Sequence, residues 1–232
     1  MNGYILLEGG SEFGGRMIEP DLRSMALSGG REAPMSILPT AAAPDHNDQH
    51  AGHNGERWFR NVGVKHITVV PVIDAASAAD PSLATILLNS HFVYMLGGFP
   101  RFLGETLAGS PCAQSIRQVY EAGGVVGGSS AGAMVLCEHY YDPETGSILQ
   151  GLNYIPAACV VPHHNTFGRR WAPRLVDLLP DDTLIGIDEE TGMLDDGPAG
   201  AWTVYGGGAV TLYRKGVPTV FNRGEKIHRL FE

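Results

Sequence analysis

The chain has 232 residues, of which 44% are hydrophobic, and this length suits a single domain spanning residues 1–232 around one buried core. Its formal net charge of −9 argues against the basic surface that nucleic acids and anionic membranes attract. No apolar run reaches the ~18 residues of a membrane-spanning helix, and residues 1–10 lack the basic start of an export signal. We therefore expect a cytoplasmic protein with no nucleic-acid or membrane partner.

The first half of the chain alternates between predicted strands and helices. Short apolar or β-branched runs predict strands over residues 4–7, 35–39, 66–73, 92–96 and 125–128. Helices are expected over residues 18–27, 55–61, 80–89, 110–122 and directly after residue 130. This alternation is typical of an α/β fold with a doubly wound, mostly parallel sheet flanked by helices. Residues 66–73 are predicted to form an interior strand of that sheet.

The most polar segment, residues 44–57, contains three histidines. Together with Asp45 and Asp48 they suggest a metal site, but no two of them lie on an element predicted to be rigid: His46, His50 and His53. A solvated loop leading into the helix at 55–61 is the expected structure. The three cysteines lack C-x-x-C spacing and are expected to be reduced core thiols: Cys112, Cys137 and Cys159. We predict no metal and no organic cofactor.

The second half continues with strands at 159–161 and 183–187. Three further runs at 201–205, 209–213 and 219–221 alternate in polarity and are separated by glycine turns, which predicts a C-terminal antiparallel meander. There is no internal repeat and no segment with the composition of a linker.

The strand at 125–128 leads into a G-x-S-x-G motif formed by Gly128, Ser130 and Gly132, followed by good helix formers. A serine at a sharp strand-to-helix turn projects its Oγ from the sheet, beside the free N–H groups of the helix start. This spacing predicts a nucleophilic serine. Ser129 is the neighbouring candidate, but its flanking residues fit the motif less well.

A nucleophilic serine needs a base and a carboxylate that orients it. His163 and His164 follow one predicted strand, and Glu189 and Glu190 follow the next. Since carboxyl ends of parallel strands meet at one edge of a sheet, these residues are expected to converge on Ser130. The order is serine, histidine, glutamate, whereas an α/β-hydrolase has serine, acid, histidine. The N–H groups of Ala131 and of the 97–98 loop are candidates for an oxyanion hole.

The chain resembles the serine peptidases that include dipeptidase E and cyanophycinase, relatives of class I glutamine amidotransferases. Five segments carry the resemblance, of which the nucleophile motif is the most specific: 9–12 (GGSE), 38–41 (LPTA), 95–98 (MLGG), 128–133 (GSSAGA) and 186–191 (GIDEET). A further run leads from Gly151 through Pro156 to His163.

This resemblance implies a catalytic triad of Ser130, His163 and Glu189, with an oxyanion hole at Gly98 and Ala131. His164 falls where the family has phenylalanine. The implied activity is hydrolysis of a small peptide or isopeptide through an acyl-enzyme, with a preference for aspartyl residues. A homodimer is an open expectation.

Two departures from the family concern the substrate. After residues 97–98 the family has an acidic or amide residue, whereas this chain has Phe99, Pro100 and Arg101. Before the histidine, cyanophycinase-like members have an aspartate and an amide, whereas this chain has Val161-Pro162. The expected substrate-binding residues are Phe99, Arg101, Arg169 and Arg170, with Arg174 as a further candidate. The alternative for the three arginines after the histidine is that they open a helix and are only solvated. Alternative functions are an esterase or amidase with the same triad, or a binding module that uses the fold without catalysis.

Overall fold

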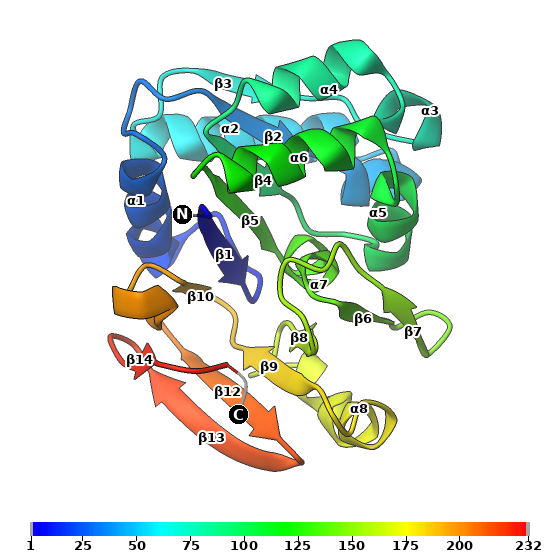
Figure 1. Ribbon diagram of the computed structural model, residues 1–232, viewed down its shortest axis with the longest axis vertical. Helices are drawn as coiled ribbons and strands as arrows, with labels where there is room; N and C mark the ends of the chain where they lie inside the picture. The colour runs from blue at the N-terminus through cyan, green and yellow to red at the C-terminus, as the bar shows by residue number, and fades with distance from the viewer. Residues whose placement is uncertain (1, 231–232) are drawn as a thin grey trace.

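An eight-stranded, mostly parallel sheet runs through the structure (Figure 1). The computed structural model describes residues 2–230. The strand order is β14-β11-β10-β1-β5-β4-β2-β3. The parallel strands are β1 (Tyr4–Glu8), β5 (Val125–Ser129), β4 (Phe92–Met95), β2 (Met35–Leu38) and β3 (Ile67–Val69). Beyond β1 the sheet continues with antiparallel strands: β10 (Thr191–Leu194), β11 (Trp202–Gly206) and β14 (Lys226–Ile227). The predicted mostly parallel sheet is confirmed.

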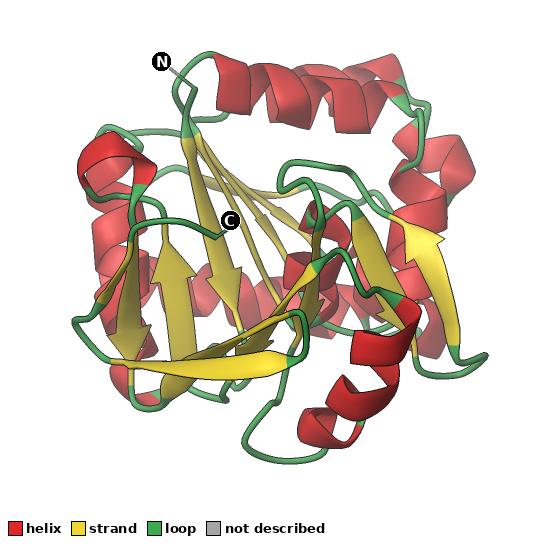
Figure 2. Cartoon of the chain, turned by 60° about the horizontal axis from the view of Figure 1, so that its bottom comes forward, coloured by secondary structure: helices red, strands yellow, loops and turns green. Residues whose placement is uncertain are grey.

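Helices cover both faces of this sheet (Figures 1 and 2). One face packs on α1 (Ile18–Leu27) and α2 (Asp48–Val62). The other packs on α3 (Ala75–Ala78), α4 (Pro81–Leu88), α5 (Pro100–Leu107), α6 (Pro111–Glu121) and α7 (Ala131–Leu136). Side chains of Asp80 and Ser110 cap α4 and α6, each of which begins with proline. The predicted helices at 18–27, 80–89 and 110–122 are confirmed. None of the helices within residues 2–230 has the length and apolar composition that crossing a membrane requires.

A second sheet of four strands contains the rest of the C-terminal part: β8 (Ala158–Val161), β9 (Thr183–Ile187), β12 (Ala209–Arg214) and β13 (Val217–Asn222). The C-terminal antiparallel strands are thus confirmed, but they do not form one continuous meander. β11 pairs within the large sheet, whereas β12 and β13 pair within the second. The chain crosses between the sheets at the glycines 206–208, where Gly206 has a φ of 97°.

Several short elements lie outside the predicted pattern. The chain also forms a hairpin of β6 (His139–Asp142) and β7 (Ser147–Gln150), helix α8 (Ala172–Leu178) and short 3₁₀ turns at Gly15–Met17, Thr40–Asp45, Gly168–Arg170 and Pro198–Gly200. Strand β10 begins directly after the acidic pair at 189–190. The hairpin packs against α5 and against α7, the helix that follows Ser130 (Figure 1).

The predicted interior strand at 66–73 is wrong in position and length. β3 covers Ile67–Val69 and lies at the edge of the large sheet. Pro71 has no N–H to donate to a neighbouring strand, which ends the pairing there. Val70 and Val72 are nevertheless completely buried. The apolar run therefore reflects burial in the core rather than an interior strand.

The predicted loop at residues 44–57 is also wrong, because α2 begins at Asp48. The buried face of α2 includes two glycines, which conceal the helical pattern of apolar residues. A Cβ on Gly52 would lie 2.6 Å from Val69, and one on Gly55 would contact Ile37. These glycines let α2 approach the sheet closely. Within residues 2–230, no three His, Cys, Asp or Glu side chains are grouped as metal ligands would be.

Candidate active site

Ser130 lies at the turn between β5 and α7. Its φ of 49° and ψ of −112° fall in a region that non-glycine residues rarely occupy, and such strain is concentrated at functional sites. A Cβ on Gly128 would come within 2.6 Å of the backbone of Gly132. A Cβ on Gly132 would come within 2.2 Å of the carbonyl oxygen of Met95. The two glycines of the motif therefore let strand and helix close around the serine.

The two candidate serines differ in what their side chains contact. Ser129 is completely buried, and its Oγ has no hydrogen-bond partner among the described residues. The Oγ of Ser130 lies 3.1 Å from Nε2 of His163. Ser130 is therefore the serine that has a base beside it.

His163 connects Ser130 to a carboxylate, because its Nδ1 lies 2.8 Å from Oε1 of Glu189. The neighbouring His164 turns the other way and is buried, with Nε2 at 2.8 Å from the hydroxyl of Tyr213. The structure thus brings Ser130, His163 and Glu189 into one hydrogen-bonded chain of the kind that activates a serine. Their catalytic role remains a prediction.

Backbone hydrogen bonds to the glycine pair after β1 hold the base and the acid in place. The N–H of His163 donates to the carbonyl of Gly9 at 2.7 Å, and the N–H of Glu190 donates to the carbonyl of Gly10 at 2.9 Å. Gly10 has a φ of 118°, and a Cβ there would lie 2.2 Å from Cε1 of His163. The imidazole therefore packs directly on the backbone of Gly10, at a position that only glycine allows.

Three side chains near the triad were not predicted from the sequence. Thr166 donates from Oγ1 to Oε1 of Glu189 at 3.2 Å. Asn165 accepts the N–H of Glu189 on its Oδ1 at 2.9 Å. The ring of Phe167 stacks on the imidazole of His163 at 4.5 Å between centroids. These contacts fix the orientation of the base and the acid. The three residues carry no sequence motif, and the signal that could have identified them is their position shortly after His163.

The two N–H groups expected to form an oxyanion hole flank Ser130. Ala131 is the first residue of α7, so its N–H has no acceptor within the helix. A Cβ on Gly97 would lie 3.2 Å from Cβ of Ser130, and Gly98 has a φ of 140° beside the carbonyl of Ala41. Neither Gly98 nor Ala131 donates a backbone hydrogen bond elsewhere in residues 2–230. Both remain candidates to stabilise an oxyanion.

Two cavities adjoin the loop of Gly97 and Gly98, and both carry negative charge. One of about 280 Å³ has two carboxylates in its lining, Glu12 and Asp45. The other, of about 600 Å³, is lined by the expected substrate residues Phe99 and Arg101, by Phe102 and by three acidic side chains: Glu105, Asp142 and Glu144. Arg101 donates from Nε to Glu105 at 2.8 Å, so its charge is already paired.

The predicted arginines after the histidine belong to the segment that follows β8, whereas Arg101 belongs to α5. Arg169 and Arg170 are exposed in a 3₁₀ turn that follows Phe167, and no ion pair of the described residues includes them. Arg174 donates from Nη2 to the carbonyl of Gly146 at 2.9 Å, in the β6–β7 turn. Arg174 therefore contacts the hairpin, and its part in substrate binding stays a prediction.

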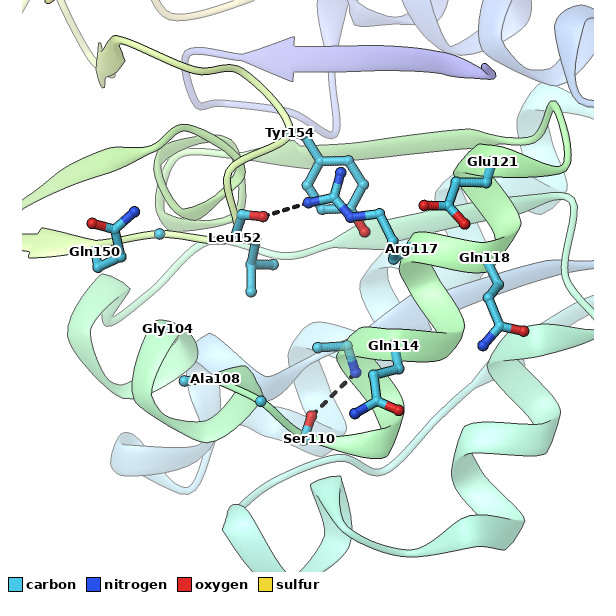
Figure 3. A pocket seen from close by; sticks show the side chains of 13 residues that line it. Gly104, Ala108, Ser110, Gln114, Arg117, Gln118, Glu121, Gln150, Leu152 and Tyr154 are labelled. Carbon is cyan, nitrogen blue, oxygen red and sulfur yellow. Dashed lines mark hydrogen bonds between the residues drawn. The ribbon is translucent and has the colours of Figure 1, made fainter. Parts of the chain in front are cut away.

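A third cavity of about 590 Å³ lies between α5, α6 and the segment after β7 (Figure 3). Its wall contains Arg117, whose guanidinium lies 3.5 Å above the ring centroid of Tyr154 and donates to the carbonyl of Leu152. None of the triad residues lines it. This cavity is therefore separate from the candidate active site.

Comparisons with known proteins show the family to which the chain belongs. Residues 5–198 match the model of peptidase family S51. The chain is 30% identical over 226 residues to a cyanophycinase of Synechococcus elongatus, covering 90% of this chain and 67% of the relative. It is also 30% identical over 204 residues to a cyanophycinase of Geminocystis herdmanii, covering 81% of this chain and 72% of the relative.

Solved structures have the same fold. A crystal structure of a peptidase from an acI-B1 Actinobacterium superposes with a TM-score of 0.88 at 28% identity, covering 98% of this chain and 97% of that chain. A putative peptidase E from Listeria monocytogenes has a TM-score of 0.61 at 15% identity, covering 92% and 99%, and thus shares the fold. Because the family model covers most of the chain, the protein belongs to peptidase family S51 and is a serine peptidase.

Proposed function

We propose that the protein hydrolyses small peptides or isopeptides through an acyl-enzyme on Ser130. The observation that carries this proposal is the continuous hydrogen-bonded chain from Ser130 Oγ through His163 to Glu189, with distances of 3.1 and 2.8 Å. Oγ attacks the substrate carbonyl carbon while Nε2 of His163 takes its proton. The same nitrogen then returns the proton to the leaving amine as the C–N bond breaks. Water hydrolyses the remaining ester by the same proton transfers in reverse.

The groups around this chain have supporting roles. Glu189 accepts the Nδ1–H of His163, which keeps Nε2 free to act as a base and stabilises the imidazolium that forms. The N–H groups of Gly98 and Ala131 donate to the oxyanion of the tetrahedral intermediate, where each donor is worth about 10²–10³ in kcat in related chemistry. No step requires a cofactor.

Charge near the site bears on substrate choice. An aspartyl preference needs cationic or amide donors near the substrate carboxylate. Arg101 is paired with Glu105, and further carboxylates line both neighbouring cavities. The alternative cations, Arg169 and Arg170, lie in the turn after Phe167. Comparing kcat/KM for Asp-Leu, Asn-Leu and Leu-Leu dipeptides decides this point. Ratios within about tenfold exclude a site built around a substrate carboxylate, which would discriminate by far larger factors.

A serine-reactive phosphonate tests the nucleophile. We expect one equivalent of label on Ser130, no labelling of Ser130→Ala, and normal labelling of the matched control Ser129→Ala. Labelling of Ser129, or full dipeptidase activity in Ser130→Ala, would overturn the mechanism. A protein that is labelled and cleaves simple esters but no peptide would instead be an esterase on the same scaffold.

A further inference from the structure

Two carboxyl groups are completely buried on the face of the large sheet that α1 and α2 cover. Glu8 is the last residue of β1, and Asp21 lies in α1; both are 0% exposed. No ion pair of the described residues includes either of them. A buried carboxylate without a cation is strongly disfavoured, so the pair cannot carry two negative charges without another source of stabilisation.

Hydrogen bonds account for one oxygen of each group. The hydroxyl of Tyr94 donates to Oε2 of Glu8, and Nε1–H of Trp58 donates to Oδ2 of Asp21 at 2.7 Å. The remaining oxygens, Oε1 of Glu8 and Oδ1 of Asp21, are buried without any other partner. The two groups are neighbours: a Cβ on Gly192 would lie 3.4 Å from Cγ of Glu8 and 3.3 Å from Pro20, which precedes Asp21, and each carboxyl group affects the pKa of the other. Two carboxylates have no donor between them, whereas one added proton satisfies both orphan oxygens.

Burial raises the pKa of Glu8 well above its usual range and raises the pKa of Asp21 to about 7. Charged or titratable groups that face the pair do not offset this. The Glu12 carboxylate, from the loop after β1, raises both pKa values further, and the pKa of Tyr94 on β4 is itself raised by burial, which keeps its hydroxyl a donor. The surroundings therefore favour retention of a proton at neutral pH.

The backbone of Glu8 is directly connected to the nucleophile turn. The carbonyl oxygen of Glu8 accepts the N–H of Ser130 at 3.0 Å, and Glu8 lies opposite Ser129 in the register of β1 and β5. The next two residues, Gly9 and Gly10, accept the backbone hydrogen bonds that hold the histidine and the acid. Any shift at the end of β1 is thus transmitted to every part of the candidate triad.

We infer that Glu8 and Asp21 share one proton in a buried acid pair that fixes the end of β1, and that Glu8 is thereby a positioning residue for Ser130. The positioning role rests on the proposed function of Ser130, whereas the shared proton does not. When the pair loses its proton at high pH, two negative charges face each other behind the nucleophile. The end of β1 should then move away from the turn that contains Ser130. As a result, kcat should decrease at high pH.

Amide substitutions test the shared proton directly. In Glu8→Gln the side-chain carbonyl can still accept from Tyr94 while the NH₂ group donates to Asp21. Asp21→Asn does the same in the opposite direction. Each single variant therefore mimics the protonated pair and should fold. In the double variant two NH₂ groups face each other, so its stability should fall well below the sum of the two single effects.

The measurements are thermal and denaturant unfolding of wild type, both single variants and the double variant at pH 5, 7 and 9, with Glu56→Gln as a surface control. The folded pKa values are raised, so wild-type stability should decrease as pH rises, and unfolding at pH 7 should release about one proton more than in Glu8→Gln. Additive losses in the double variant, or an unchanged pH slope in Glu8→Gln, would overturn the shared proton.

Activity tests the positioning role separately. The alkaline decrease of kcat in wild type should be absent in Glu8→Gln, whereas Glu8→Leu, which has neither donor nor acceptor, should lose at least ~tenfold in kcat with KM little changed. An alkaline limb that persists in Glu8→Gln would overturn the positioning role. If Ser130→Ala is fully active, the proposed function is wrong. The unfolding experiments still test the shared proton in that case, because they do not depend on activity.

Discussion

Replacing Gly10 with alanine should move the base of the candidate triad without altering any triad side chain. The new Cβ would lie 2.2 Å from Cε1 of His163, and ordinary contact begins near 3.4 Å, so the ring must retreat by about 1.2 Å. A displacement of ~1 Å at a reacting group can lower the rate ~10²-fold. We therefore expect kcat of Gly10→Ala to fall by about two orders of magnitude, with a smaller change in KM.

Strain must be separated from displacement, because Gly10 also has a φ of 118°. A non-glycine residue in such a conformation costs about 1–3 kcal/mol. Gly30→Ala is the matched control, since Gly30 has a φ of 88° and open space around its added Cβ. Gly30→Ala should lose stability through backbone strain alone and keep its activity, whereas Gly10→Ala should lose more stability because it adds the clash with His163. Dipeptide hydrolysis at a temperature well below both melting transitions makes the comparison. If folded Gly10→Ala keeps kcat within about threefold of wild type, His163 is not held against Gly10 during catalysis.

Other substitutions separate neighbouring side chains. His163→Ala should lower kcat by ~10⁴, as expected for loss of a triad base. His164→Ala should instead lower stability by about 1–3 kcal/mol, because it removes a buried imidazole and its hydrogen bond to Tyr213. Steady-state kinetics and chemical denaturation distinguish the two outcomes. Arg101→Ala should change kcat/KM for Asp-Leu by less than ~tenfold, because the guanidinium is engaged by Glu105; a larger loss confined to acidic dipeptides would contradict this. Thr166→Val should lower kcat only ~10-fold or less, since one hydrogen bond to the acid is lost, and a drop as large as that of His163→Ala would show that the acid depends on this hydroxyl.

The sequence was sufficient for those features whose signal is local. The G-x-S-x-G turn around Ser130 and the strand ends before His163 and Glu189 follow from short motifs, and the structure brings these side chains together. The elements that were mispredicted depend on distant contacts. Helix α2 uses glycines on its buried face, because the sheet lies very close to it, and hydrophobic periodicity cannot detect such a helix. The chain after β11 likewise changes sheets at Gly206, which alternation of polarity does not reveal.

The supporting residues of the site were missed for a related reason. Asn165, Thr166 and Phe167 are ordinary loop residues in the sequence, and their contacts with base and acid exist only because β8 and β9 end side by side. Glu8 is similarly inconspicuous, as a polar residue after an apolar strand. Glu8 is buried because α1 packs over β1. Its neighbour Asp21 comes from α1, and Trp58, which donates to Asp21, comes from α2. Polar residues that face each other across elements cannot be paired from sequence spacing alone.

The candidate active site is assembled at the junction of the two sheets rather than within either one. The large sheet provides Ser130 at the end of β5, while the second sheet provides His163 after β8 and Glu189 after β9. The backbone hydrogen bonds from His163 and Glu190 to Gly9 and Gly10 directly connect these halves. Since β1 ends immediately before these glycines, the packing behind β1 sets the distance between nucleophile and base. Substitutions at the end of β1 should therefore affect catalysis more than equally buried substitutions in β2.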